Sequence, residues 1–290
     1  MLKTNADRLV KISVAGQVDS PRLPGLPAAP HFIGRDGKPR LVPYIGSIVP
    51  NVRVGDRALG WVAENIEPGV ALRAKDAGAH MALKIYACVG NKAAVMSGMA
   101  KGAVGTVTGK SGRFADHIIV DFPPDVLERM AIDDRVQIQA HGTGLQIQGM
   151  PGVMCKSLSP ALLDAWGLSI EGDCLCTPVA AVVPPELMGA GAGLTSEGGA
   201  VAIQTGDAET LAQYKLDRLR LGDLVALIDY DSTYGYGFKR GAVSVGVVSH
   251  GDSVRPGYGP GVTVLLTAPN GDIEPMLRDG VNVADLLKLR

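Results

Sequence analysis

The most constraining feature of this 290-residue sequence is that its apolar residues come in short runs, each interrupted by Gly, Pro or Asp. Glycine (38 residues) and proline (19 residues) together make up about a fifth of the chain, whereas average proteins contain roughly 12% of the two. Runs of Val, Ile and Ala bounded by such residues are typical of short β-strands, and helical periodicity is scarce. The sequence therefore predicts a mostly β fold with many short strands.

A local pattern recurs four times in the sequence: an apolar residue, a polar turn that carries Asp, and then an alternating strand. Gly supplies a positive φ in such a turn, and the Asp side chain can accept a hydrogen bond from the turn's own backbone. Small β-barrels use turns of this kind to lead the chain into a strand. The copies span residues 52–59, 131–138, 170–175 and 219–227. Because their spacing is too irregular for a solenoid, we expect β-barrel-like modules.

The alternation stops at a cluster of Pro and Gly, Gly149-Met150-Pro151-Gly152, which marks a candidate boundary. We therefore predict two tandem β-barrel-like modules, residues 1–150 and 151–290. A few short helices are expected within them, at residues 124–130, 159–166, 207–214 and 283–289. The second of these has Ser159 at the N-cap, Pro160 in the first turn and Gly167 at its end, which is good helix punctuation.

A glycine-rich segment of the first module, at about residues 92–122, resembles the strand-turn-strand signature of KOW-type SH3-like barrels. In translation proteins with this signature the loop contacts RNA. Phosphate binding is driven by accumulated positive charge, and few basic residues lie near this loop. They are Lys92, Lys101, Lys110 and Arg113. A structural barrel turn is therefore favoured over an RNA contact.

The overall charge and hydropathy exclude several classes of partner. Lys and Arg number 28 against 29 Asp and Glu, a net charge of −1, so there is no bulk electrostatic attraction to nucleic acid or anionic lipid. No apolar run approaches the roughly 18 residues of a membrane span, and the first residues lack the apolar core of a signal peptide. We expect a cytoplasmic protein without a membrane partner. The four cysteines lack the spacing of a zinc site.

Two loops hold polar groups among glycines and prolines. In residues 60–70, Glu64 and Glu67 are three positions apart and can share an ion or a proton if the loop turns; a solvated acidic turn is the alternative. In residues 184–195, the alternating glycines around Gly191 allow backbone N–H groups to converge on an anion. The alternative there is a loop packed closely under a neighbour.

A third loop follows an apolar strand that delivers His250 and Asp252 to a stretch rich in Gly and Pro. Residues two apart in an extended chain face the same way. His250 and Asp252 therefore suit a metal ion, or a base with its orienting carboxylate; residues that cap a turn are the alternative. Arg255 and Tyr258 follow in the same loop.

Other titratable residues are less informative. Asp229 and Asp231 are expected to share one strand face upstream of the third loop. Three histidines stand alone in the sequence: His31, His117 and His141. Each is interpreted as a satisfied surface or core residue rather than a ligand.

Four motifs taken together resemble one family. They are residues 46–56, residues 60–70, Gly105-Thr106-Val107-Thr108-Gly109-Lys110 and Gly257-Tyr258-Gly259-Pro260-Gly261-Val262. The combination is similar to a bacterial and archaeal family known as domain of unknown function 4438, and the similarity runs from about Pro39 to about Thr267. The resemblance implies a two-module, mostly β fold, and it brings no settled activity.

The chain departs from the family's pattern in two places. The family's acidic-His pair before Glu-Pro-Gly resembles Glu64-Asn65, and its Gly-His-Gly-Pro-Gly resembles the segment that carries Tyr258. Asn65 and Tyr258 therefore stand where two histidines are expected. If those histidines bind a metal in relatives, this chain lacks two nitrogen ligands.

Three classes of function stay open. The first is a hydrolase or lyase that cleaves an amide-type C–N bond of a small polar molecule, with or without the assistance of a divalent metal. Its catalytic candidates are His250, Asp252, Glu67, Glu64 and Arg255. Its substrate-binding candidates are Tyr258, Asn65, Asp229, Asp231 and Gly191. The ligands of a metal, if one is present, would be His250, Asp252 and Glu67.

The second class is a non-catalytic small-molecule-binding or assembly protein, and the third is an RNA contact of the KOW type. An enzyme needs the loops at residues 64–67, 229–231 and 250–258 to meet in one pocket. That pocket can lie within one subunit or across the interface of a homo-oligomer, which we expect the protein to form.

Overall fold

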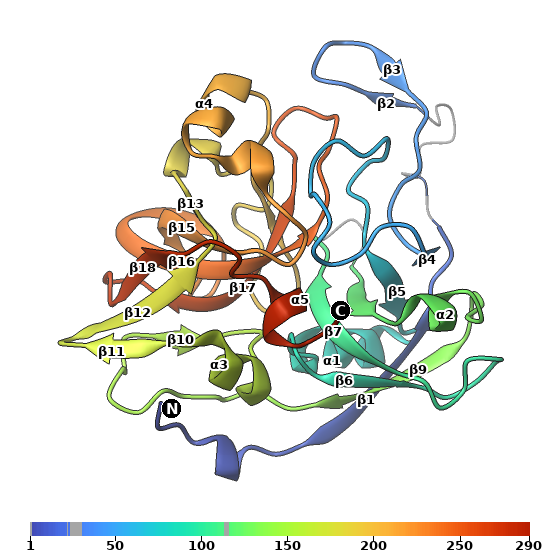
Figure 1. Cartoon of the computed structure of the whole chain (residues 1–290), viewed down its shortest axis with the longest axis horizontal. Helices are drawn as coiled ribbons and strands as arrows, with labels where there is room; N and C mark the ends of the chain where they lie inside the picture. The colour runs from blue at the N-terminus through green and yellow to red at the C-terminus, as the bar shows by residue number, and fades with distance from the viewer. Residues whose placement is uncertain (1, 22, 24–30, 113–115) are drawn as a thin grey trace.

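The computed structural model describes residues 2–21, 23, 31–112 and 116–290 and consists mostly of β-strands with five short α-helices in these ranges. Two β modules lie side by side, and a two-stranded hairpin projects at one end of the molecule (Figure 1). The hairpin is formed by β2 (Phe32–Ile33) and β3 (Pro39–Arg40). The prediction of a mostly β protein with two modules is confirmed.

The first module is a closed barrel of six strands. The strand order is β1-β9-β6-β7-β8-β5, and β1 also pairs with β5, which closes the ring. Strand β4 extends the sheet beyond β5. The bounds are β1 Ile12–Val18, β4 Ile48–Val49, β5 Gly69–Arg73, β6 Lys92–Val95, β7 Val104–Lys110, β8 Ile118–Asp121 and β9 Arg135–Ala140. The 92–122 segment thus supplies three successive antiparallel strands of this barrel.

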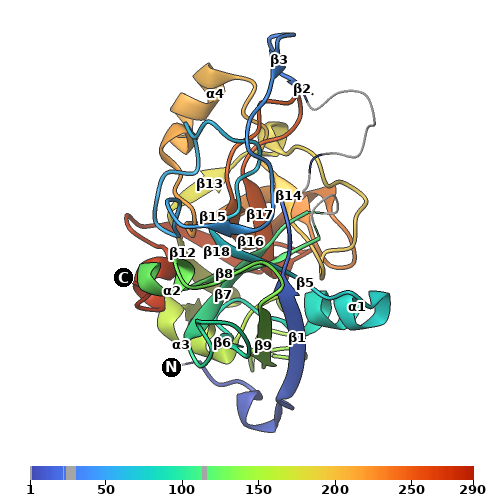
Figure 2. The same ribbon diagram turned by 90° about the vertical axis from the view of Figure 1, so that its right-hand side faces the viewer.

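Alternating side chains fill the barrel, as the period of two in its strands requires. In β9 the buried residues are Val136, Ile138 and Ala140, and the residues between them are exposed. Helix α1 (Ala77–Tyr86) projects from the side of the barrel (Figure 2). It packs on β1 through Leu83, because Gly16 has no side chain there: a Cβ on Gly16 would lie 2.9 Å from a methyl of Leu83.

The second module is built around β16 (Gly237–His250), which pairs with β15 on one side and β17 on the other. The described pairings form an open path, β10-β17-β16-β15-β13, with β14 added to β17, beside a three-stranded sheet β11-β12-β18. The other strands are β10 Met154–Cys155, β11 Ser169–Glu171, β12 Cys174–Val179, β13 Ala181–Val183, β14 Val201–Ala202, β15 Leu224–Asp231, β17 Gly261–Ala268 and β18 Ile273–Leu277.

The short helices mostly lie where the sequence predicts them. They are α2 Pro124–Leu127, α3 Pro160–Trp166, α4 Ala208–Gln213 and α5 Val283–Leu286. In α3 the Ser159 side chain accepts a hydrogen bond from the Leu162 N–H, and Gly167 ends the helix in the left-handed region. Within the described chain no helix combines the length and apolar composition needed to cross a membrane.

The recurrent Asp turns form as expected. In three copies the carboxylate accepts a hydrogen bond of 2.8 Å from the backbone N–H three residues earlier; the pairs are Arg53–Asp56, Ala131–Asp134 and Arg220–Asp223. Each copy also holds a residue with positive φ directly before its last Asp. These are Gly55 (96°), Asp133 (70°), Gly172 (60°) and Gly222 (88°). The turn chemistry inferred from the sequence is confirmed for three copies, and the copy at residues 170–175 shows the positive φ.

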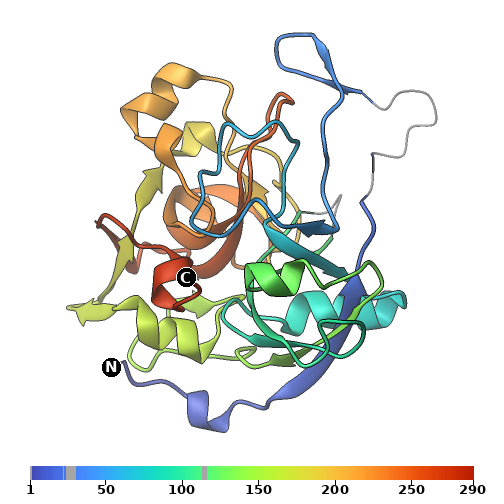
Figure 3. The same ribbon diagram turned by 45° about the vertical axis from the view of Figure 1, so that its right-hand side comes forward.

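Two of these turns pair with each other and join the modules. The Ala58 N–H donates to the Leu219 carbonyl and the Leu221 N–H donates to the Asp56 carbonyl, both at 2.8 Å. The loop after the first turn therefore lies against the second module, where it meets the loop after β16 (Figure 3). The two loops exchange backbone hydrogen bonds, since the Gly251 N–H donates to the Ile66 carbonyl at 2.8 Å.

Candidate functional site

A small cavity opens where the loops of the two modules meet. Its polar wall consists of Tyr44, Asn65, Ser111, His250, Arg255 and Tyr258, and the rest is small or apolar, including Gly191. The cavity volume is ≈ 70 Å³, on the measure in which one water molecule needs about 10–15 Å³. The site therefore admits a molecule of a few heavy atoms. Five of the predicted site residues line this cavity.

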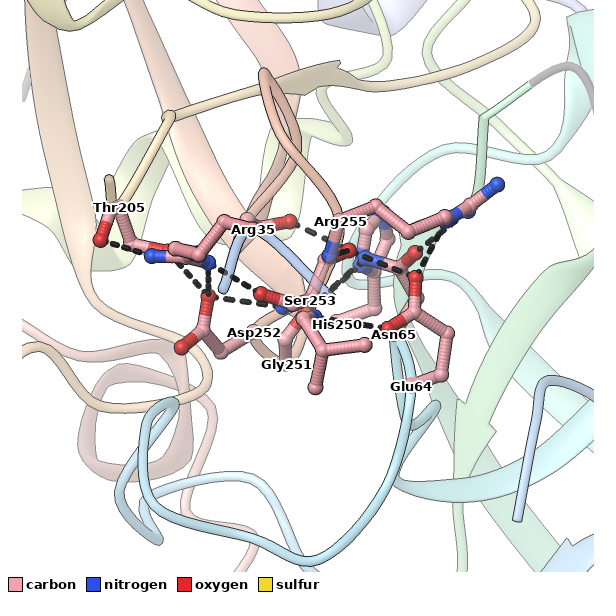
Figure 4. A network of polar contacts seen from close by, with 11 residues as sticks. Arg35, Glu64, Asn65, Thr205, His250, Gly251, Asp252, Ser253 and Arg255 are labelled. Atoms are coloured by element: carbon pink, nitrogen blue, oxygen red, sulfur yellow. Dashed lines mark hydrogen bonds and ion pairs between the residues drawn. The ribbon is translucent and has the colours of Figure 1, made fainter. Parts of the chain in front are cut away.

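Glu64 organises the loop that follows β16 (Figure 4). Its side chain is fully buried, and Oε1 accepts hydrogen bonds from Ser253 Oγ (2.6 Å) and Arg255 Nε (2.7 Å). Oε2 accepts the backbone N–H of Val254 (2.8 Å). Because three donors from successive residues saturate the carboxylate, Glu64 fixes the loop and orients Arg255.

Arg255 is held among three aromatic rings. Its guanidinium carbon lies 4.3 Å from the ring centroid of Tyr258, 5.7 Å from that of Phe32 and 6.0 Å from that of Tyr44. Such contacts favour a cation over the ring face. The side chain is 22% exposed and lines the cavity. Arg255 is therefore a cation fixed at the cavity wall, suited to a carboxylate or another oxyanion.

His250, at the end of β16, is a neutral base candidate. Nδ1 lies 3.2 Å from the Gly251 carbonyl oxygen, an acceptor that requires the proton on Nδ1 and leaves the lone pair on Nε2. Burial lowers the pKa of His250, against the opposing charges of Glu67 and Glu64. Nε2 has no hydrogen-bond partner among the described residues. It is also not one of the atoms that lack both a partner and contact with solvent.

Two neighbours shape the space around His250. Asn65, with a left-handed φ of 48°, directs its amide group to the carbonyls of Gly251 (3.3 Å) and Gly259 (3.1 Å). Gly261 lies against the imidazole ring at Nε2, and a Cβ at that position would be 1.9 Å from this atom. The last glycine of the Gly-Tyr-Gly-Pro-Gly motif thus leaves room for the ring.

Glu67 belongs to a second buried network, and its key partner is His117, one of the three histidines interpreted from the sequence as satisfied surface or core residues. His117 is fully buried, with Nδ1 2.9 Å from Glu67 Oε2 and Nε2 3.0 Å from Asp19 Oδ2. Burial opposes the charge, but the charge and hydrogen bonds of Glu67 and Asp19 raise the pKa of His117 to about 9. His117 is therefore an imidazolium between two carboxylates.

The carboxylate of Glu67 is also fully engaged. It accepts hydrogen bonds from His117, from the backbone N–H of Gly46 (3.0 Å) and from the hydroxyl of Ser111. Burial alone would raise the pKa of Glu67, but the imidazolium of His117 holds it below its ordinary value. Glu64 and Glu67 therefore do not share an ion or a proton, since each has its own cation.

The structure does not pair Asp252 with His250. Asp252 Oδ1 accepts hydrogen bonds from Thr205 Oγ1 (2.5 Å) and from the Ser253 N–H (2.7 Å), and Arg35 lies 3.8 Å away. Figure 4 shows this carboxylate and Glu64 at opposite ends of the network. Between His250 and Asp252 the strand ends, so the alternation that would align them no longer applies. Asp252 instead fastens the loop to Thr205.

Asp229 and Asp231 lie at the other end of the β15–β16 ribbon from His250. Asp229 sits in a β-bulge with φ 53°, where it accepts the Gly241 N–H at 2.7 Å. Asp231 accepts the Thr233 N–H at 2.9 Å. Neither lines the cavity. The bulge also removes the shared face expected for the pair, and both carboxylates serve turns.

The loop around Gly191 reaches the cavity, but much of its backbone is already bonded. The N–H groups of Gly189, Ala190 and Gly193 donate to carbonyls at 2.7–2.8 Å. These three amides are therefore not free to converge on an anion. Gly191 itself adopts φ 125° and lines the same cavity as His250.

No metal centre is formed by the described residues. No group of three or more His, Cys, Asp and Glu side chains converges there. Of the three proposed ligands, Asp252 is turned to Thr205 and Glu67 is saturated by His117, Gly46 and Ser111. Their donors do not meet His250 at a common centre, so the residues do not fit the ion.

Fold and site together define a class: a two-module β protein with a small cavity where its modules meet. Family models for domain of unknown function DUF4438 match the chain, the N-terminal domain at residues 31–164 and the C-terminal domain at residues 165–287. The chain belongs to the DUF4438 family. The models meet at 164/165, whereas the division predicted at 150/151 stays a prediction.

A solved structure adds to the comparison. The crystal structure of TM1086 is similar to this chain at 36% sequence identity and a TM-score of 0.91, covering 98% of each chain. No curated protein matches the chain. The family is described only as a domain of unknown function, so the features that bear on function are those of the cavity.

Proposed function

We propose that this protein is an enzyme, a hydrolase or lyase that acts on an amide-type C–N bond of a small oxyanion-bearing molecule in the cavity. The observation that supports this most is His250: a neutral imidazole whose Nδ1 proton is held by a carbonyl, whose Nε2 lone pair has no described hydrogen-bond partner, and which lines the cavity beside the fixed cation of Arg255. A base with a lowered pKa next to an anion-binding group is a common catalytic arrangement.

In this proposal the roles divide between residues that touch the ligand and residues that position them. Arg255 binds the oxyanion, and His250 takes a proton from water or from the ligand. The charge of Glu67 favours the imidazolium that this transfer creates. Glu64 orients Arg255, and Asn65 holds the two backbone carbonyls around His250.

The proposal does not rely on a metal, because the donors of His250, Asp252 and Glu67 point to different partners. It also leaves out Asp229 and Asp231, which shape turns away from the cavity. We do not propose an RNA contact, since the β6–β7 turn carries one lysine, Lys101, in a chain with net charge −1.

Ammonia release tests the proposal directly. Purified protein is incubated with small amides that carry a carboxylate, and His250→Gln and Arg255→Lys are compared with the wild type. We expect His250→Gln to lose turnover and keep binding, and Arg255→Lys to raise KM, because lysine lacks the planar fork and stacking of arginine. His141→Gln is the matched control. Turnover that survives His250→Gln would overturn the assignment.

A second candidate is non-catalytic binding of the same kind of ligand. It is supported by the saturation of both Glu64 and Glu67 by protein partners, which leaves the cavity without a carboxylic acid ready to donate a proton. Calorimetry separates the two candidates: ligand binding with no product formed at any pH between 5 and 9 favours the binding protein.

We also propose a homo-oligomer. The β2–β3 hairpin projects at one end of the molecule (Figures 1 and 2), where the Arg35 N–H in its turn donates to the Val254 carbonyl at 2.8 Å. Apolar side chains in and near the hairpin are exposed: Ile33 is 57% exposed, Leu41 66% and Val62 82%. Contact with another subunit would remove these apolar side chains from water. Light scattering of the wild type and Leu41→Asp tests this, with a monomer for both as the contrary result.

A further inference from the structure

Tyr44 is a phenol at the cavity wall that the proposed function does not use. It lies between β3 and β4, and the residues on both sides of it are fastened to the loop that carries the two glutamates. The Glu64 N–H donates to the Pro43 carbonyl at 2.9 Å, and the Gly46 N–H donates to Glu67 Oε2 at 3.0 Å. These contacts fix the backbone of Tyr44 beside the cavity.

The ring and the hydroxyl of Tyr44 both contact Arg255. The ring centroid lies 6.0 Å from the guanidinium carbon and 5.1 Å from the centroid of the Phe32 ring. The phenol also forms a hydrogen bond with the Arg255 side chain. Because arginine has donors and no acceptor, the phenol oxygen accepts in this bond, and the phenolic hydrogen has to find another acceptor.

That hydrogen is available to a ligand. Within the described part of the chain no side chain or carbonyl accepts it. Burial raises the pKa of Tyr44, and the charge of Arg255 opposes this only in part. The phenol therefore keeps its proton at neutral pH and can donate it in a hydrogen bond, next to a cation that lines the same cavity.

Arg255 itself has fewer donors to offer than a free arginine. Of its five N–H groups, the one on Nε donates to Glu64 Oε1 at 2.7 Å, and one on Nη2 donates to Asn65 Oδ1 at 3.5 Å. The side-on contact that uses Nε together with Nη2 is therefore closed to a ligand carboxylate. A carboxylate has two oxygens that accept hydrogen bonds, so a further donor beside the guanidinium would complete its binding.

From these contacts we infer that Tyr44 is a second ligand-binding residue, whose hydroxyl donates a hydrogen bond to the oxyanion that Arg255 holds. The inference rests on the proposed function in placing an anion on Arg255. It adds a specificity: two donors side by side recognise a group with two acceptor oxygens, and they favour a carboxylate over a single carbonyl.

Calorimetry with malonamate, a small amide that carries a carboxylate, tests the hydroxyl. Tyr44→Phe removes the donor and keeps the ring between Phe32 and Arg255. We expect malonamate to bind at least about tenfold more weakly, since hydrogen bonds to charged groups are worth more than neutral ones. Tyr86→Phe is the matched control, because Tyr86 ends helix α1 and lies outside the cavity. Unchanged affinity in Tyr44→Phe would overturn the inference.

An ultraviolet difference spectrum separates a donor to the ligand from a residue that only positions Arg255. A phenol that donates a new hydrogen bond to an anion absorbs at longer wavelength. Malonamate should therefore shift tyrosine absorption in the wild type and in Tyr258→Phe, and the shift should be absent in Tyr44→Phe. A wild type that binds malonamate without a tyrosine shift would overturn the inference, and this holds even if Tyr44→Phe does not fold.

The two proposals fail in different ways. Binding of malonamate that is weakened in Arg255→Lys and unchanged in Tyr44→Phe contradicts the role of Tyr44 and supports the anion site. If neither malonamate nor acetate binds to the wild type at millimolar concentration, the anion site on Arg255 is wrong, and the inference fails with it. Binding that depends on Tyr44 without release of ammonia supports the inference and contradicts the enzyme.

Discussion

Glu64 and Glu67 are three residues apart in one loop, and both are fully buried, yet they are neutralised in opposite ways. Glu64 meets the guanidinium of Arg255, which lines the cavity and stacks on aromatic rings. Glu67 meets the imidazolium of His117, which is sealed in the interior and shared with Asp19. We call these pairs the arginine pair and the histidine pair.

This difference distinguishes a pair that can bind a ligand from a pair that stabilises the fold. Arginine stays protonated at every pH at which a protein folds, so the arginine pair is a constant feature of the cavity wall. The histidine pair exists only because two carboxylates raise the pKa of a buried imidazole. One pair is therefore suited to hold a ligand, and the other makes the fold sensitive to pH.

Removing the cation of the histidine pair should have the largest effect. His117→Leu leaves Glu67 and Asp19 without their shared partner, and breaking a buried ion pair from one side costs about 3–5 kcal/mol of unfolding free energy. Urea denaturation at pH 6 measures it, with His141→Leu as a control at a less buried histidine. A loss below about 1 kcal/mol would show that His117 is not charged in the folded protein.

The arginine pair should be somewhat less sensitive. Arg255→Leu strands the buried Glu64, but the arginine is about one-fifth exposed, so water can reach part of the site and the expected loss is about 3 kcal/mol at most. Arg255→Lys keeps the charge and should lose less stability while still losing ligand affinity. If Arg255→Lys binds small carboxylates as well as the wild type, the guanidinium does not hold the anion.

The pH dependence of the wild type distinguishes the two pairs without mutation. The pKa of His117 is raised to about 9, so its stabilisation is complete below about 6.5, the value for an unfolded histidine, and is lost as the pH rises towards 9. Burial lowers the pKa of Lys110 to about 8, and a lowered lysine pKa makes stability rise with pH above that value.

We therefore expect unfolding free energy to fall by about 2 kcal/mol between pH 6.5 and 8 and to level off above pH 8. Denaturation curves across this range for the wild type and His117→Leu isolate the contribution of His117. A fall of the same size in both proteins would assign the pH dependence to another group.

Local chemistry explains how much of this molecule can be predicted from the sequence. The Asp turns and the cap at Ser159 depend on residues three positions apart, and both form as expected. Helix α1 was not predicted. Only His80 and Leu83 of its residues are buried, so it has almost no apolar period, and tertiary packing against β1 determines it.

The site was predictable only in part, for a related reason. The Glu64–Glu67 loop and the loop after His250 can be recognised because Gly and Pro mark them as loops with polar residues. The contact between His117 and Glu67 links positions 50 residues apart, and nothing near His117 in the sequence indicates it. The Asp252 interpretation extended strand alternation past the end of β16, where it does not hold.

A change at Gly261 tests whether the space against the imidazole ring of His250 must stay free of a side chain. Gly261→Ala puts a Cβ where Nε2 of His250 lies, so the ring must move; overpacking of this kind costs about 1–3 kcal/mol. We expect a loss near the lower end, with ligand binding or turnover lost. Gly237→Ala is the control, because a Cβ there meets nothing within 4 Å. A Gly261→Ala protein with wild-type function would exclude His250 from the site.

The smallest effect is expected at the third carboxylate of these loops. Asp252 accepts its hydrogen bonds from Thr205 and Ser253 through Oδ1, and asparagine keeps an oxygen acceptor at that position. Asp252→Asn should therefore change unfolding free energy by less than about 1 kcal/mol and leave ligand affinity unchanged, whereas His250→Gln should change turnover. Thermal denaturation and calorimetry measure both. If Asp252→Asn lowers turnover as much as His250→Gln does, the carboxylate acts on His250 during the reaction, and the division into an arginine pair and a histidine pair leaves out a third participant.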